Sequence, residues 1–137
     1  MIVVALVRMH RIGCLVDAAI YGFAVGAGFA LAENLYYLHL AAEAGMGTWI
    51  VRGFGTALMH GGTTALFAVM GLARVERAAH AKAVHFVPGF LAAALLHSGF
   101  NHLGHLPLLE TLATMLTLPP LLWLVFERSE SSVYSRR

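Results

Sequence analysis

Four polar residues lie inside long apolar stretches of this 137-residue sequence, and their side chains are of the types that perform acid–base chemistry. They are Glu33, His60, His97 and Asn101. A carboxylate or an imidazole can remove a proton from water, while imidazole and amide N–H groups can donate hydrogen bonds to a developing oxyanion. His97 and Asn101 are four residues apart, a spacing that places them on one face of a helix. Residues of these types can supply the base and the oxyanion donors that hydrolysis needs.

Glu33, His60 and His97 could also bind a metal ion. One carboxylate and two imidazoles with an open fourth position form a reasonable ligand set for catalytic zinc. The three residues come from separate segments, and the sequence contains no His-Glu-x-x-His motif. Two chemistries therefore stay open: metal-free hydrolysis with Glu33 as the base, and hydrolysis at a zinc ion held by Glu33, His60 and His97.

The composition indicates that a lipid bilayer surrounds these residues. Hydrophobic residues make up 59% of the chain and charged residues only 12%, with a mean hydropathy of +0.75. Soluble domains usually carry about twice that charged fraction. The net charge of +2 does not indicate a nucleic-acid partner, because the basic residues lie between apolar segments and form no stripe. A single cysteine, Cys14, excludes an intrachain disulfide and a thiolate metal cluster.

Four segments are apolar at about the length that spans a membrane, and we expect each to be a helix. The fourth is short, lies between Glu110 and Glu127, and contains Pro119-Pro120, so we expect it to be kinked. The fold class predicted is all-α: a polytopic bundle of about four transmembrane helices over residues 1–127, followed by a polar cytoplasmic tail at 128–137. The four segments are residues 13–42, 53–73, 83–105 and 111–126.

The distribution of positive charge predicts the orientation of this bundle. Of the nine Lys and Arg residues, all but Arg52 lie before the first segment, between the second and third, or after the fourth. Cytoplasmic loops carry such an excess, so both termini are expected in the cytoplasm of a multi-pass cell-membrane protein. At about 1.5 Å per residue, Glu33, His60 and His97 then lie roughly 13 to 18 Å below the outer helix ends, and Asn101 roughly 7 Å. Asp17 lies at the cytoplasmic end, where we expect it either to cap a helix N-terminus or to contact the inner loop.

Small residues at four-residue spacing predict where the helices approach one another. Such rows let two helix backbones come close together in lipid. The first row lies in the first apolar segment and the second row in the second segment: Gly22, Gly26 and Ala30, then Gly53, Ala57, Gly61 and Ala65.

Three ordered stretches, DAAIYGFAVGAGFALAENLYYL, RGFGTALMHGGTTALFAVMG and LLHSGFN, resemble the PrsW family of intramembrane proteases, which is related to the type II CAAX-processing proteases. The resemblance covers about residues 13–103. It implies an all-helical membrane protease that acts on membrane-anchored protein substrates such as anti-sigma factors. The family's site motifs correspond to Phe29-x-x-x-Glu33-Asn34, Met59-His60-Gly61 and His97-x-x-x-Asn101. The resemblance implies that Glu33 and His60 orient water or hold a metal, and that His97 and Asn101 donate to the oxyanion.

One motif of the family is absent from this sequence. The family also carries Glu-Glu-x-x-Lys or Arg on an earlier helix, and the sequence has no Glu-Glu pair. We therefore expect either an N-terminally truncated piece or a degenerate member, in which Glu33 is the only candidate base at this depth. Three alternatives stay open: a non-catalytic membrane module that binds partner helices, a proton or metal transporter, and a polar network that only stabilises the helix packing. A transporter commonly shows repeated halves, and the sequence shows none.

Overall fold

A computed structural model describes residues 2–40, 45–78, 82–102 and 106–134, and within them the chain is helical, with no strand. Four spans are long and apolar enough to cross a membrane: α2, α3, η1 together with α4, and α5 up to residue 131. The predicted all-α membrane fold is therefore confirmed. The elements are α1 (Ile2–Arg8), α2 (Leu15–Leu40), α3 (Met46–Val75), the short 3₁₀ helix η1 (Ala83–Phe86), α4 (Val87–Asn101) and α5 (Pro107–Tyr134).

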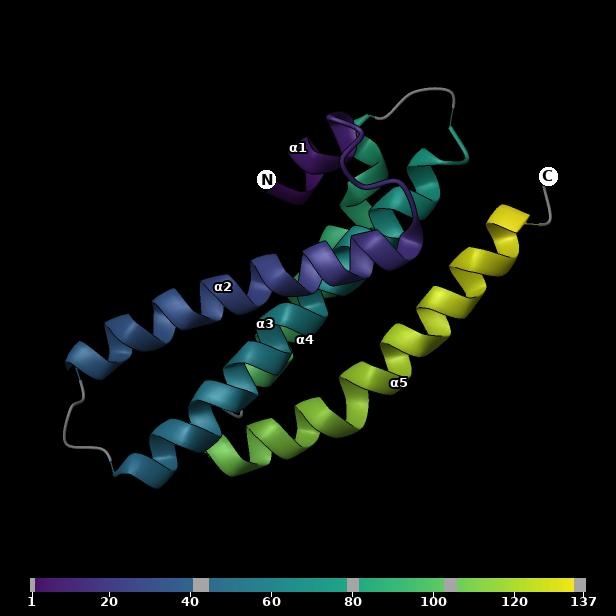
Figure 1. Ribbon diagram of the computed structural model, residues 1–137. Coiled ribbons are helices and arrows are strands. Elements are labelled where there is room, and N and C mark those ends of the chain that lie inside the picture. Colours follow the sequence, from purple (N-terminus) through teal and green to yellow (C-terminus); the bar gives the residue numbers. More distant parts are fainter. Residues whose placement is uncertain (1, 41–44, 79–81, 103–105, 135–137) are drawn as a thin grey trace.

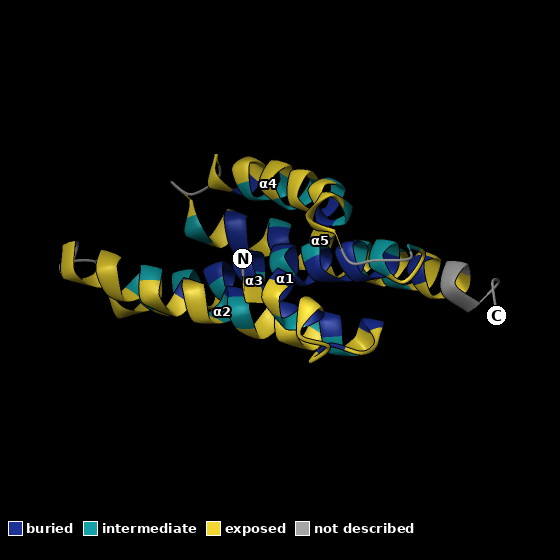
Figure 2. Cartoon of the chain, turned by 90° about the horizontal axis from the view of Figure 1, so that it is seen from above, coloured by how far each residue is buried: buried dark blue, intermediate teal, exposed yellow. Residues whose placement is uncertain are grey.

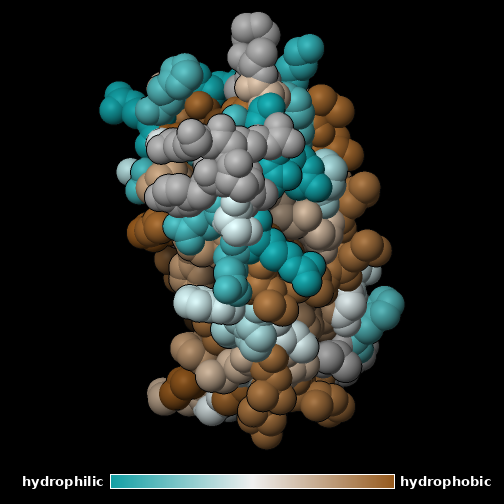
Figure 3. Space-filling view, turned by 90° about the vertical axis from the view of Figure 1, so that its right-hand side faces the viewer, coloured by the Kyte–Doolittle hydropathy of each residue, from teal (hydrophilic) through white to brown (hydrophobic). Residues whose placement is uncertain are grey.

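Helix α3 is the centre of the bundle. Helices α2, α4 and α5 each pack on α3 far more than on one another (Figures 1 and 2). As a result α3 is buried along most of its length, while the outer sides of the other three helices are exposed. These outer sides carry large apolar residues, which suits contact with lipid tails. They include Ile20, Leu95, Leu116 and Trp123. On the face shown in Figure 3, hydrophilic side chains gather toward one end and apolar ones cover much of the remainder.

The α2–α3 contact depends on small residues, as predicted. Gly22 and Gly26 of α2 are buried, and a Cβ atom at either position would lie within 3 Å of α3 atoms. On α3 only the second half of the predicted row takes part, because Gly61 and Ala65 are buried in the contact whereas Gly53 faces open space. The two helices are therefore closest in the C-terminal half of α3.

The helix ends differ from the predicted segment ends. Helix α3 begins at Met46 rather than at residue 53, so Arg52 lies inside a helix. Helix α5 runs through Pro119-Pro120 and on to Tyr134, so much of the expected polar tail is helical. Apolar length marks where a helix leaves lipid, but a helix can continue into water with polar residues. The predicted ends at residues 42 and 105 lie outside the described residues.

Helix α1, the C-terminal end of α3, η1 and the C-terminal end of α5 lie toward the same end of the bundle (Figure 1). At this end the valines of α1 pack on the N-terminal part of α2 and the C-terminal part of α3. Asp17, in the first turn of α2, accepts a hydrogen bond from the backbone N–H of Gly13 in the preceding loop at 3.4 Å. Of the two predicted roles, this is the loop contact. Helix α5 changes direction near its prolines, as expected from their missing N–H groups. The cytoplasmic location of this end and the division at residue 127 stay predictions.

Candidate active site

The centre of the site is a carboxylate–imidazole pair between α2 and α3. Oε2 of Glu33 lies 2.9 Å from Nε2 of His60. The His60 side chain is 8% exposed and that of Glu33 is 28% exposed. Gly26 of α2 packs directly on the backbone of His60 and Gly61, and this close approach places Glu33, two turns further on, within reach of the imidazole. Each of two polar groups inside the membrane-spanning region thus has a partner, which lowers the cost of placing them there.

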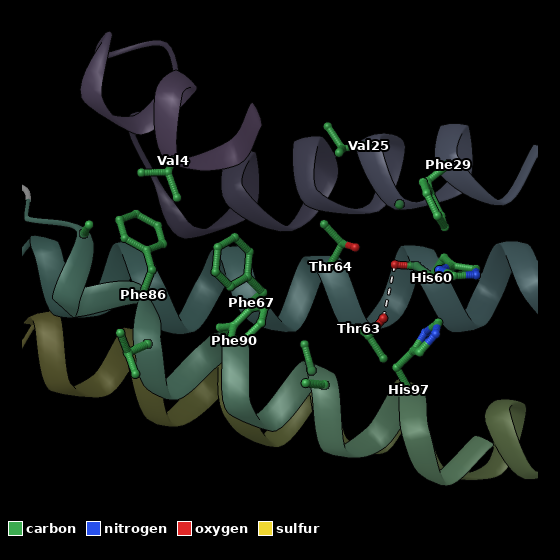
Figure 4. A pocket seen from close by; sticks show the side chains of 15 residues that line it. Val4, Val25, Phe29, His60, Thr63, Thr64, Phe67, Phe86, Phe90 and His97 are labelled. Carbon is green, nitrogen blue, oxygen red and sulfur yellow. Dashed lines mark hydrogen bonds between the residues drawn. The ribbon is translucent and has the colours of Figure 1, made fainter. Parts of the chain in front are cut away.

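His97 joins the pair from α4. Its ring centroid lies 4.7 Å from that of His60, with the ring planes tilted by 53°. On the opposite side, the edge of the Phe29 ring approaches His60 at a centroid distance of 4.9 Å. Figure 4 shows Phe29 and His97 pointing toward His60 from α2 and α4. The structure therefore brings Glu33, His60 and His97 together from three helices, as their predicted depths required.

A second polar link between α2 and α3 lies one helical turn nearer to the N-terminus of α3. The side-chain amide of Asn34 donates a hydrogen bond to the hydroxyl of Thr56 at 2.5 Å, and that hydroxyl donates to the carbonyl of Arg52 at 2.9 Å. The guanidinium carbon of Arg52 lies 4.5 Å from the centroid of the Tyr37 ring, a cation–π contact. Because Asn34 directly follows Glu33, this link also fixes the place of the carboxylate.

Asn101 is less closely associated with the site. It is the last residue of α4 and is exposed. Within the described part of the chain, its side chain makes no hydrogen bond with Glu33, His60 or His97. Its predicted role as an oxyanion donor stays a prediction.

The sequence analysis treated Glu110 only as the boundary of an apolar segment, whereas the structure buries this residue. Glu110 lies in the first turn of α5 and is 5% exposed. Apolar residues lie on both sides of Glu110, from Leu106 to Leu109 and from Leu112 onward, but this pattern does not show whether the carboxylate is buried between helices or lies at the membrane surface.

An apolar groove of about 520 Å³ leads to the site between α2 and α4. This volume is within the range of ligand-binding pockets. It begins near Val4 and Phe86 at the end of the bundle that holds the N-terminus, and it reaches Phe29, His60 and His97 (Figure 4). None of the residues lining it is an Asp, Glu, Lys or Arg. The Thr63 hydroxyl on its wall donates to the carbonyl of Met59 at 2.7 Å and is thereby satisfied.

The predicted zinc ligands do not form a three-donor site as they are placed. A metal site needs donor atoms that converge on one point at about 2 Å. Glu33 and His60 instead direct their donor atoms at each other, and the described residues contain no group of three His, Cys, Asp or Glu side chains arranged to hold a metal ion. The donor types suit zinc, but this arrangement of the side chains does not.

The fold and the site together define a class: a multi-pass membrane protein with a partly buried carboxylate–imidazole pair, whose imidazole lines an apolar groove. The model of the family described as PrsW family intramembrane metalloprotease matches residues 1–125 of the chain. This match covers most of the 137 residues, and the chain belongs to the PrsW family. No curated protein and no solved structure matches the chain closely enough for comparison. The family description names a metal, and the side chains as placed here do not gather around one.

Proposed function

We propose that this chain hydrolyses peptide bonds of membrane-anchored protein substrates, such as anti-sigma factors, within the cell membrane. The observation that carries the proposal is the 2.9 Å contact between Glu33 and His60 inside the membrane-spanning region. A partly buried acid–base pair beside a cleft is typical of a catalytic site. Membership of a protease family agrees with this chemistry.

In the proposed mechanism Glu33 accepts a proton from a water molecule while the water oxygen attacks the substrate carbonyl carbon. His60 holds the carboxylate in place through their shared hydrogen bond. The N–H of His97 and the amide of Asn101 donate to the oxyanion that forms. The proton held by Glu33 then passes to the leaving nitrogen as the C–N bond breaks, so that one water is consumed and the carboxylate is regenerated.

The groove is the proposed binding place for the apolar part of the substrate. Phe86 and His97 both line it and are eleven residues apart, which is roughly 16 Å along the helix. That length accommodates about five residues of extended peptide. An uncharged lining favours an apolar segment, because burying a charge there without a partner is costly.

The test is cleavage by the purified 137-residue chain in lipid vesicles, using a mixture of synthetic apolar peptides and mass spectrometry of the new termini. Alanine at Glu33, His60 or His97 should abolish cleavage, with losses of about 10²-fold or more for the base, while the variants still insert into the membrane. Glu127→Gln, which changes an exposed carboxylate of α5, is the matched control. Normal cleavage by all three alanine variants would show that the site assignment is wrong.

A second outcome is informative as well. If the wild-type chain retains a peptide but cleaves none, the protease proposal fails, and the non-catalytic membrane module becomes the better account.

A further inference from the structure

Thr64 carries the one side-chain hydroxyl of the groove that has no partner among the described residues. Apart from His60 and His97, the lining side chains that can form hydrogen bonds are Thr63 and Thr64. The Thr63 hydroxyl donates to the carbonyl oxygen of Met59 at 2.7 Å. In the part of the chain that the structure describes, the Thr64 hydroxyl makes no hydrogen bond, and the mechanism above does not use it.

The missing bond has a physical cause in the α2–α3 contact. A threonine in a helix commonly donates its hydroxyl to the backbone carbonyl four residues before it. Four other threonines of the described helices do so: Thr56, Thr63, Thr111 and Thr117. For Thr64 this acceptor is the carbonyl of His60. That oxygen is already 3.3 Å from the hydroxyl of Thr63, and Gly26 of α2 packs directly against it. Because this carbonyl is crowded, the Thr64 hydroxyl stays available for another partner.

The free hydroxyl is accessible from the groove. Thr64 is half-buried, and the buried side-chain oxygens without a partner in the described residues belong to Asn34 and Thr114 instead. Figure 4 shows the Thr64 side chain pointing from α3 toward α2 at the wall of the pocket. Thr64 follows His60 by four residues, so it lies on the same face of α3, about 6 Å further along the helix.

A peptide that lies extended in this groove needs such a group. Its backbone N–H and C=O groups have no partners of their own, and leaving them unpaired in an apolar place is costly. The rest of the lining offers little, because it consists of Gly26 and of alanine, valine and phenylalanine side chains on helices. Two residues of extended peptide span about 6.6 Å, which matches the separation of Thr64 from His60. The hydroxyl therefore lies beside the peptide group about two residues from the bond that is cleaved.

We propose that Thr64 is a substrate-binding residue, whose hydroxyl forms a hydrogen bond with the substrate peptide group about two residues from the scissile bond, on the side that faces η1. The proposal rests on the proposed function and adds a binding group to it. A hydroxyl can donate to the peptide C=O or accept from the peptide N–H. Either bond favours an extended substrate over a helical one at this place, because a helix uses these groups for its own bonds.

The first test compares variants in the vesicle assay, using a peptide that the wild-type chain cleaves. Thr64→Val keeps the shape of the side chain and removes the hydroxyl. We expect kcat/KM to fall about tenfold, mainly through KM, as for the loss of one hydrogen bond that binds substrate and transition state alike. Thr64→Ser keeps the hydroxyl and should retain more than half of the wild-type kcat/KM. The control Thr117→Val removes an exposed hydroxyl of α5 and should change neither constant. Equal constants for Thr64→Val and Thr117→Val, or a Ser variant as impaired as the Val variant, would overturn the proposal.

The second test removes the partner on the substrate. An ester in place of one amide lacks the N–H group and has a weaker carbonyl acceptor. Peptides with an ester at the second position on either side of the scissile bond are compared with the all-amide peptide. Wild type should cleave one of the two esters about tenfold less efficiently, whereas Thr64→Val should cleave it as well as the amide peptide. An ester effect of the same size in wild type and in Thr64→Val would show that no such bond exists.

A binding measurement separates this proposal from the proposed function. A fluorescent peptide of leucine and alanine is titrated into wild type, Thr64→Ser and Thr64→Val in detergent. If wild type binds the peptide without cleaving it, the protease proposal fails, and a Kd about tenfold weaker for Thr64→Val than for Thr64→Ser still supports the binding role of the hydroxyl. Equal Kd values for these two variants, or no binding by wild type, would refute that role.

Discussion

Replacing Gly26 by alanine tests whether the close approach of α2 and α3 builds the site. A Cβ atom at residue 26 would lie 2.5 Å from the carbonyl carbon of His60 and 2.8 Å from the Cα atom of Gly61, and closer still to the carbonyl oxygen of His60. Carbon atoms normally approach to about 3.5 Å, so the two helices must separate by about 1 Å. The obstacle is backbone, which cannot rotate away as a side chain could.

Two consequences follow from this separation. Overpacking of this kind costs about 1–3 kcal/mol of stability, and a displacement of about 1 Å at a catalytic site can reduce the rate about 10²-fold. The Glu33–His60 contact, now 2.9 Å, would lengthen beyond hydrogen-bonding distance. We therefore expect Gly26→Ala to insert into the membrane, to unfold at a lower temperature, and to lose most of its cleavage activity.

The matched control is Gly28→Ala on the same helix, where a Cβ atom would meet nothing within 4 Å. This control should be at least as stable as wild type, because alanine favours helix formation over glycine by about 1 kcal/mol. Thermal unfolding in detergent and cleavage in vesicles measure the two effects. If Gly26→Ala matches Gly28→Ala in both assays, the reasoning from helix contact to site geometry is refuted.

Two further predictions concern the groove and the orientation. Ala94→Phe places a large ring in the groove and should raise KM for apolar peptides. The control Leu95→Phe lies on the outer side of α4, at a position that is 74% exposed, and should leave KM unchanged. Equal KM values for the two variants would show that substrate does not use the groove. Cys14 is the only cysteine and is exposed at the end predicted to be cytoplasmic, so a membrane-impermeant maleimide should label it in inside-out vesicles and not in intact cells. A Cys14→Ser chain that carries Gly45→Cys at the start of α3 should be labelled in intact cells and not in inside-out vesicles. Labelling of Cys14 in intact cells would contradict the predicted orientation.

The sequence predicted the helices and the similar depths of Glu33, His60 and His97, because both follow from one-dimensional rules. Apolar length identifies the membrane spans, and a rise of about 1.5 Å per residue gives depths at which Glu33, His60 and His97 can meet. Spacing alone could not show which side of each helix faces which neighbour. Asn101 shares a helix face with His97, yet it is exposed at the helix end.

Other features depend on how the helices pack, which a single sequence does not contain. Glu110 looked like the polar end of a span, because hydropathy does not distinguish an acid at the membrane surface from one buried between helices. Gly53 fits the spacing of its row and yet faces open space, since the C-terminal end of α2 and the N-terminal end of α3 diverge. The groove likewise arises from the way α2 and α4 flank α3, and no local motif encodes it.

The central position of α3 has a consequence for how the chain enters the membrane during synthesis. Among the four described spans α3 has the lowest mean hydropathy, 1.3, and α2 has the highest, 1.7. The polar groups that make α3 a poor lipid-facing helix, Thr56 and His60, bond to Asn34 and Glu33 of α2. Helix α2 is made first, so these partners are already in the bilayer when α3 emerges. The contacts that shape the site thus also favour the insertion of the helix that carries it.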